Sequence, residues 1–278
     1  MPQDDTAIVP MTPDHLDAAV ALSVEAGWPH RRADWELVLG LGEGRVALDR
    51  AGQVLGTVLF LPFGSTAGAI CMVIVSERLR GRGIGRRLFT AAMELAGPRV
   101  LRLTASPQGE PLYRSMGFEP QEYIFQRQGV VRAVEAIPGP ELARPDDLAQ
   151  IIALDAAAFG TDRSALLTAI AARGRFAVIR QGDRVRSFAA CRTFGRGELI
   201  GPAVVSEDAD AKALLAFLAR ECEGRFVRLD LMPGTGLEPW LDQIGLMEVD
   251  TALVMWTEAP QLAAGGPRTV VLAAQAVG

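Results

Sequence analysis

The second half of the chain repeats the first, and this repeat limits the fold to two similar units. The segment MTPDHLDAAVAL, which begins at Met11, is echoed about 130 residues later by ARPDDLAQIIAL. VIVSE likewise recurs as AVVSE, and LYRSMGFE as WLDQIGLM. A chain of 278 residues with 49% hydrophobic residues can give each repeat its own core. We predict two tandem domains, residues 1–137 and 138–278, which meet in the proline-containing stretch EAIPGPEL.

Each repeat alternates helical and extended patterns. In the first repeat, TPDHLDAAVALSVEAG places proline at the first helical position and apolar residues at helical spacing, which predicts a helix. RVALD, QVLGTVLFLPF and GAICMVIV predict three successive strands, and LRLTA predicts another after the next helix. This order indicates an α/β fold in which helices flank a central sheet.

A segment rich in glycine and arginine, SERLRGRGIGRRLF, separates the GAICMVIV strand from the helix that begins at Ile84. Glycines at such a corner let an anion approach the unpaired N–H groups of the helix N-terminus, and the arginines add positive charge. The segment therefore predicts a pyrophosphate site. Its glycine spacing breaks the G-x-G-x-x-G dinucleotide pattern, and no Lys-Ser or Lys-Thr follows as in a P-loop.

The second repeat has SEDADAKALLAF where the first has this glycine-rich segment. An ungapped comparison places Ala213 and Leu215 opposite Gly83 and Gly85. A corner that needed glycine for folding alone would need it in both repeats, so the contrast favours a binding role in the first repeat. We expect the second repeat to be degenerate and to lack the site.

Composition excludes several classes of partner. The net charge of −5 makes nucleic acid an unexpected partner. Three cysteines and two histidines without metal-ligand spacing predict reduced thiols and no metal site, with Cys71 as an inert thiol in an apolar strand. No run of about 18 apolar residues predicts a membrane span. The N-terminus lacks a signal-peptide pattern, so we expect a cytoplasmic protein with no membrane partner.

Arg80, Gly83 and Gly85 match the pattern Arg/Gln-x-x-Gly-x-Gly/Ala, and here the chain resembles the GNAT family of acyl-CoA-dependent N-acetyltransferases. The preceding VIV strand, the LYRSMGF segment and the order of elements agree with this family. The resemblance is strong over residues 5–128. Over residues 140–257 it rests on the repeat and the hydrophobic pattern, and is similar to the weaker second domain of tandem GNAT proteins. It implies a mixed-sheet GNAT fold in both domains.

The resemblance also implies acetyl-CoA as the co-substrate. The backbone of Val73 and Val75 would bond the pantetheine arm as an added strand does. The strand LRLTASP would diverge from MVIV and open a V-shaped slot for the thioester, with Thr104 and Ser106 at its edge. The pyrophosphate would be held by Arg80, Gly81, Arg82, Gly83, Ile84, Gly85 and Arg86.

Tyr113 is the candidate general acid, because in this family a tyrosine in the L-Y-x-x-x-G-F segment often stands near the departing sulfur. A phenol with a pKa of roughly 10 can protonate a thiolate whose conjugate thiol has a slightly lower pKa. The alternative is that Tyr113 only packs against the cofactor. Its counterpart in the second repeat is Leu241.

Glu25 is the candidate general base, since the acceptor amine must lose a proton before it attacks the thioester. It lies in VEAGWPHRRADWEL, a helix-loop-helix that in this fold usually shapes the acceptor pocket. Trp28 and Trp35 could help to bind an amine there, although tryptophans in a helical hairpin are more often core residues. Other carboxylates in suitable regions are Asp34, Glu36 and Glu77.

These features together predict an N-acetyltransferase that transfers an acetyl group directly from acetyl-CoA to a primary amine of a small molecule or peptide. Positioning of the thioester and polarisation of its carbonyl by strand N–H groups would supply most of the rate. We expect a monomer or a homodimer. Two alternatives are a non-catalytic acyl-CoA-binding sensor and a scaffold whose second domain mediates dimerisation.

Overall fold

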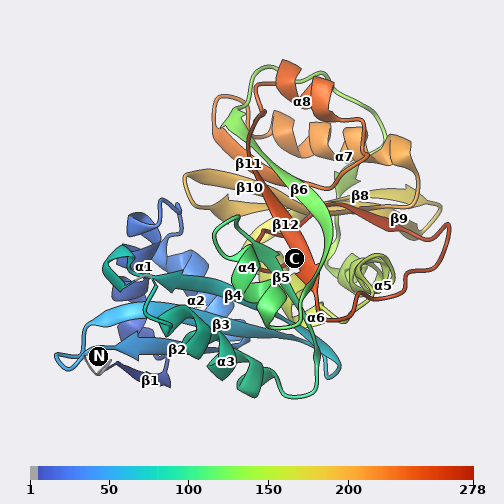
Figure 1. The fold of residues 1–278 in the computed structure, drawn as a ribbon. Coiled ribbons are helices and arrows are strands. Elements are labelled where there is room, and N and C mark those ends of the chain that lie inside the picture. The colour runs from blue at the N-terminus through green and yellow to red at the C-terminus, as the bar shows by residue number, and fades with distance from the viewer. Residues whose placement is uncertain (1–5, 80) are drawn as a thin grey trace. The chain divides into compact units, whose positions relative to one another are not determined.

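The computed structural model describes residues 6–79 and 81–278, whose helices and strands are drawn in Figure 1. Contacts divide the chain into two compact units, of which one extends to Leu103 and the other runs from Thr104 to Ala276. The elements of the first unit are β1 (Ala7–Pro10), α1 (Leu16–Glu25), α2 (Arg32–Leu41), β2 (Glu43–Leu48), β3 (Val54–Phe63), β4 (Ala67–Val75), α3 (Ile84–Ala96) and β5 (Val100–Ala105).

The strands of the first unit form a mixed sheet in the order β1-β2-β3-β4-β5. Neighbouring strands are antiparallel except β4 and β5, which are parallel. Helix α3 buries Ile84, Leu88 and Ala92, which recur every four residues and so share one face. This helix packs on β3 and β4, and α1 and α2 cover the other face of the sheet (Figure 1).

The second unit has the same kinds of elements with additional strands. They are α4 (Glu110–Ser115), β6 (Glu119–Val130), β7 (Glu141–Leu142), α5 (Leu148–Phe159), α6 (Ser164–Ala171), β8 (Gly174–Gln181), β9 (Arg184–Phe194), β10 (Gly197–Val205), α7 (Asp208–Arg220), β11 (Phe226–Leu231), α8 (Glu238–Gln243), β12 (Met247–Trp256) and β13 (Arg268–Val271). The strand order in this unit is β12-β6-β11-β13-β10-β9-β8-β7.

Strand β6, the last strand of the first sequence repeat, lies inside the sheet of the second unit. It pairs antiparallel with β11, where Leu229 faces Arg127, and with β12, where Ala252 faces Ile124. The boundary between sequence repeats and the boundary between compact units are thus different features. The first is a feature of the sequence pattern, for which the boundary near residue 137 stays a prediction, and the second reflects the pairing of β6.

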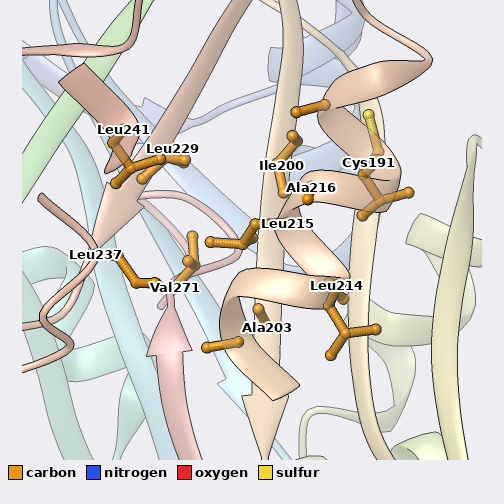
Figure 2. Close-up of a cluster of buried hydrophobic side chains, with 14 of the residues drawn as sticks. Cys191, Ile200, Ala203, Leu214, Leu215, Ala216, Leu229, Leu237, Leu241 and Val271 are labelled. Atoms are coloured by element: carbon orange, nitrogen blue, oxygen red, sulfur yellow. The ribbon is translucent and has the colours of Figure 1, made fainter. Parts of the chain in front are cut away.

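The core of the second unit lies between α7 and the sheet. Its buried side chains include Leu215 of α7, Ala203 of β10 and Val271 of β13, which Figure 2 shows gathered together. Leu241, the counterpart of Tyr113, is completely buried in the same cluster. The sequences EPLYRS of α4 and EPWLDQ of α8 form helices of equal length, so this part of the repeat is preserved in three dimensions.

Candidate active site

The glycine-rich corner of the first unit connects β4 to α3 through residues 76–83. Gly81 and Gly83 have φ angles of +77° and +81°, a left-handed conformation that strains other residues, and open space surrounds both Cα atoms. Gly83 is the N-cap of α3 and offers no side chain to its first N–H groups. Gly85 is half-buried, and Arg82 and Arg86 are exposed. Arg80 lies outside the described residues.

A cleft of about 1100 Å³ opens beside this corner, entirely within the first unit. Its walls are one face of α1, the turn between β2 and β3 with the start of β3, and residues of the glycine-rich corner, namely Ser76, Arg78, Leu79, Gly81 and Arg82. It is large enough for a part of a nucleotide-sized ligand. The charged residues along it are Glu25, Asp49, Arg50, Arg78 and Arg82.

Glu25, the last residue of α1, lies against the first residues of the glycine-rich corner. Its Oε1 accepts hydrogen bonds from Ser76 Oγ at 2.9 Å and from the backbone N–H of Glu77 at 2.7 Å. The carboxylate is exposed and lines the cleft. Glu25 therefore fixes the start of the loop, a positioning role that the sequence did not reveal.

The two tryptophans of the helix-loop-helix differ in burial. Trp35 is completely buried, and its Nε1 donates to Ser23 Oγ at 3.1 Å, so it is a core residue, as the structural alternative predicted. Trp28 is half-buried and packs edge-on against His30, with ring centroids 5.7 Å apart.

Strands β4 and β5 pair with each other over only three residues, Ala67–Ala69 with Val100–Arg102. Among the described residues, β4 therefore has no pairing with β5 beyond Ala69, which is the divergence that the family resemblance implied. Val73 and Val75 lie in this part of β4, and both are half-buried. Their opposite edge is occupied, because β3 pairs with β4 from Phe63 to Gly56.

A bulge interrupts β4 within the divergent part. Met72 has a φ of +52°, and the register of β3 and β4 shifts between Thr57 and Leu59. The buried hydroxyl of Thr57 donates to the backbone oxygen of Met72 at 2.8 Å and holds the bulge in place. Sequence reasoning missed Thr57, since a threonine inside a strand pattern carries no signal of a bulge.

Three of the predicted site residues belong to the second unit: Thr104, Ser106 and Tyr113. The backbone oxygen of Ser106 accepts from the N–H groups of Gly109 and Glu110 at 3.0 and 3.1 Å, so this residue shapes the turn before α4. Thr104 is half-buried on β5.

Tyr113 is a buried residue of α4. Burial raises the pKa of its phenol to about 12, so the hydroxyl stays protonated well above neutral pH. Its ring packs against Gly109, where a Cβ would lie 2.8 Å from Tyr113 Cε2. Glycine is thus required at position 109 for the tyrosine to take this rotamer, a second residue that the sequence did not single out.

In the second repeat, the equivalent of the divergent slot is filled by the chain itself. Strands β10 and β11 pair in parallel only at Glu198–Leu199 with Val227–Arg228. Beyond that point β13 lies between them. It pairs with Ala203, Val204 and Val205, which occupy the repeat positions of Val73, Ile74 and Val75.

The glycine-rich corner also has no equivalent in the second repeat. Only Ser206 and Glu207 separate β10 from α7, whereas residues 76–83 separate β4 from α3. The expected alignment of Ala213 and Leu215 with Gly83 and Gly85 is therefore wrong, because both residues are buried inside α7. The ungapped comparison concealed a shorter loop.

The first turn of α7 is acidic and already paired. Asp210 accepts from Arg186 Nε and Nη2 at 3.0 and 2.7 Å and from Ser187 Oγ at 2.6 Å, and Glu207 accepts from Arg186 Nη1 at 3.0 Å. Carboxylates here complement the helix dipole and repel a phosphate. The two repeats thus present opposite charges at their strand-to-helix corners.

Comparisons with known proteins agree with this geometry. Two family models, both described as acetyltransferase (GNAT) domain, match residues 42–120 and 151–266. The chain belongs to the GNAT acyltransferases and contains two GNAT domains in tandem.

A curated relative from Bacillus subtilis, an uncharacterized N-acetyltransferase called YitH, is 29% identical over 58% of each chain, so the match spans little more than half of either protein. A holothin acyltransferase from a Pseudoalteromonas species is 28% identical over 70% of this chain and 71% of its own length.

Solved structures share the fold over the whole chain. A putative acetyltransferase from Pyrococcus horikoshii superposes with a TM-score of 0.82 at 20% identity and covers 100% of this chain and 98% of its own. A tandem GNAT protein from the clavulanic acid biosynthesis pathway gives a TM-score of 0.65 at 17% identity, with 93% and 99% of the two chains covered. At these identities the likeness establishes the tandem architecture alone.

Among residues 6–79 and 81–278, no helix combines the length and apolar character needed to cross a membrane. The same residues contain no group of three or more histidine, cysteine, aspartate or glutamate side chains arranged to hold a metal ion.

Proposed function

We propose that the protein transfers the acetyl group of acetyl-CoA to a primary amine of a small molecule or peptide, at one site in its first repeat. The observation that carries this proposal is the corner after β4, where α3 presents its N-terminus behind two left-handed glycines with open space around them. A pyrophosphate can approach such N–H groups closely, because no Cβ stands in the way. Arg82 and Arg86 supply positive charge on the same segment.

The residues assigned to the cofactor follow from that corner. Backbone N–H groups from Gly81 to Gly85 would hold the pyrophosphate, with Ile84 as the first helical residue and Arg80 assigned from sequence alone. The edge of β4 at Val73 and Val75 would bond the pantetheine arm, and Thr104 and Ser106 complete the proposed set. Acetyl-CoA supplies the activated acyl group, whose thioester carbonyl the amine attacks.

Two side chains are assigned to proton transfer. Glu25 would accept the proton of the acceptor amine, directly or through water, since its exposed carboxylate lines the cleft. Tyr113 would donate its phenol hydrogen to the departing thiolate, an assignment that rests on its L-Y-x-x-x-G-F segment. Its raised pKa keeps the phenol protonated at neutral pH, so that its hydrogen is available to the sulfur.

The second repeat would bind no acyl-CoA. Its slot contains β13, and its corner is short and acidic. We propose that it serves as a degenerate GNAT domain that supports the fold.

The experiment is an acetyl-transfer assay with the full chain, acetyl-CoA, and a panel of small-molecule and peptide amines. Release of the free thiol of CoA, together with an acetylated amine detected by mass spectrometry, is the expected result. Tight CoA binding with no turnover of any amine would instead support an acyl-CoA sensor.

A further inference from the structure

Two of the three cysteines meet in the second unit, beneath the end of α7. Cys191 lies on β9 and Cys222 lies in the turn after α7, and both are completely buried. Both are free thiols, and one carboxylate connects them: Cys191 Sγ donates to Glu198 Oε2 at 3.9 Å, and Arg225, which contacts Cys222 Sγ, donates to Glu198 Oε1 at 2.6 Å. Cys71, the third cysteine, is buried on β4 of the other unit.

Two arginines point at the sulfur of Cys222. Arg225 Nη2 lies 3.5 Å from Cys222 Sγ, and Arg175 Nη2 lies 3.8 Å from it. Each arginine is held by a carboxylate, since Arg225 Nη1 donates to Glu198 Oε1 at 2.6 Å and Arg175 pairs with Glu221. Guanidinium groups at this distance stabilise a thiolate. The structure therefore places two guanidinium donors beside the sulfur of Cys222.

The same contacts shift the acidity of the pair. Interaction with the Cys191 thiol lowers the pKa of Cys222, and Arg225 and Arg175 act in the same direction against the effect of burial. The pKa of Cys191 is raised by its interaction with Cys222 and by burial. Burial alone raises the pKa of Cys71 to about 12. The two neighbouring guanidinium groups therefore favour the thiolate at Cys222 over Cys191 and Cys71.

The residues around Cys222 are exposed or partly exposed. Its neighbours Glu221, Glu223 and Gly224 are exposed. The side chain of Arg225 is 49% exposed and that of Arg175 is 31% exposed. Rotation of these long side chains would bring a small solute to the sulfur.

We propose that Cys222 is a site of oxidation by hydrogen peroxide and that Cys191 converts the product into an intramolecular disulfide. The thiolate of Cys222 attacks one peroxide oxygen, so that an S–O bond forms, the O–O bond breaks, and the leaving hydroxide takes a proton to become water. Cys191 then loses its proton, attacks the sulfenic sulfur of Cys222 and displaces a second hydroxide, which also leaves as water. Two thiols are oxidised to one disulfide while one peroxide is reduced to two waters.

The test treats the folded full chain with hydrogen peroxide, removes the peroxide with catalase, and alkylates the denatured protein before digestion and mass spectrometry. The expected product is a linked pair of peptides that contain Cys191 and Cys222, two hydrogens lighter than the separate peptides. Cys71 should be recovered alkylated, which makes it an internal control. Recovery of Cys191 and Cys222 fully alkylated, as in untreated protein, would overturn the proposal.

Variants separate the parts of the site. Cys191→Ala should stop the reaction at a sulfenic acid on Cys222 that dimedone traps, and Cys222→Ala should leave Cys191 unoxidised. Arg225→Gln should slow oxidation about fivefold or more, because losing one cation raises the thiol pKa by about one unit. Arg173→Gln, at an exposed arginine bonded to the backbone of Ala169, is the matched control and should react as the wild type does. Equal rates in both arginine variants would contradict the assigned role of Arg225.

Discussion

Ala203 of β10 is paired with Val271 of β13, at the repeat position that Val73 holds in β4. Because Val271 is completely buried beside Leu229 and Leu237 in the second core (Figure 2), β13 is a permanent part of that sheet. The edge of β4 near Val73 has no corresponding strand from its own unit among the described residues. The second repeat has thus completed its sheet with β13, and the first repeat has no such strand of its own unit at this edge of β4 among the described residues.

This difference predicts the pattern of amide hydrogen exchange. Addition of CoA should slow exchange in peptides that contain Val73 and Val75, since a bound pantetheine would accept and donate hydrogen bonds at that edge. Peptides that contain Val204 and Val205 should be protected equally with and without CoA, because β13 already covers them. Protection that appeared only in the second repeat would reverse the assignment of the site.

The hydrogen bond from Thr57 to Met72 predicts a mutational effect on catalysis. Thr57→Val leaves the Met72 oxygen without this donor, at a cost of about 1–3 kcal/mol, and should let the bulge shift. We expect the maximal rate of acetyl transfer to fall about tenfold, with a smaller change in CoA affinity. Thr57→Ser keeps the hydroxyl and should behave nearly as the wild type does. Equal rates in all three proteins would show that the bulge needs no anchor.

Tyr113→Phe removes one hydroxyl and tests the proposed acid. If the phenol assists the departing thiolate, the maximal rate should fall by roughly 10²-fold while acetyl-CoA affinity is retained. Since the pKa of Tyr113 is about 12, the mutation should not alter the shape of the pH profile below about pH 10. An unchanged rate under conditions where chemistry limits turnover would leave Tyr113 as a packing residue.

From the bonds of the Asp147 carboxylate we expect the free energy of unfolding of the second unit to depend on pH. Its carboxylate accepts from Arg180 Nη1 and Nη2 at 2.9 and 2.6 Å and from the backbone of Arg144 at 2.6 Å, and these bonds lower its pKa below the usual value. A lowered folded-state pKa gives stability that is present above the unfolded value of about 4 and lost as pH falls through the folded value.

Asp147→Asn should therefore lower the melting temperature by several degrees at pH 7, and the gap to the wild type should close only below about pH 4. Asp146→Asn, at the exposed neighbouring residue, is the control and should change little. A gap that was constant from pH 7 to pH 3 would mean that the pairing of Asp147 contributes no pH-dependent stability.

Much of this architecture could be predicted from the sequence, because hydrophobic periodicity and the repeat determine which segments form strands and helices. The pairing of β6 could not, since periodicity shows that Ile124 is buried but does not show which strand lies beside it. The alignment of the two corners was wrong for a related reason. An ungapped alignment of the two repeats places Ala213 and Leu215 opposite the glycines, and only the start of α7 at Asp208 shows that the loop of the second repeat is shorter.

The candidate site, like the fold, could be predicted from the sequence only in part. The phosphate site is a prediction from the sequence, because so many glycines and arginines in one short segment are unusual in themselves. Glu25 and Thr57 bond distant backbone, at Glu77 and Met72, and Gly109 leaves room for the ring of Tyr113. Such contacts depend on the folded geometry and leave no pattern in the chain.

The most direct test of the account is calorimetric titration of the full chain with CoA. The account predicts one site per chain, and it predicts that Gly83→Asp weakens CoA binding at least tenfold, because a carboxylate in the proposed nest repels the pyrophosphate. Gly182→Asp is the matched control: Gly182 also has a positive φ, +62°, and open space around it, but lies between β8 and β9. Unchanged affinity in this control, with one site in the wild type, is the predicted result. Two equivalent sites, or normal affinity in folded Gly83→Asp, would contradict the central claim that the first repeat alone binds CoA through its glycine-rich corner.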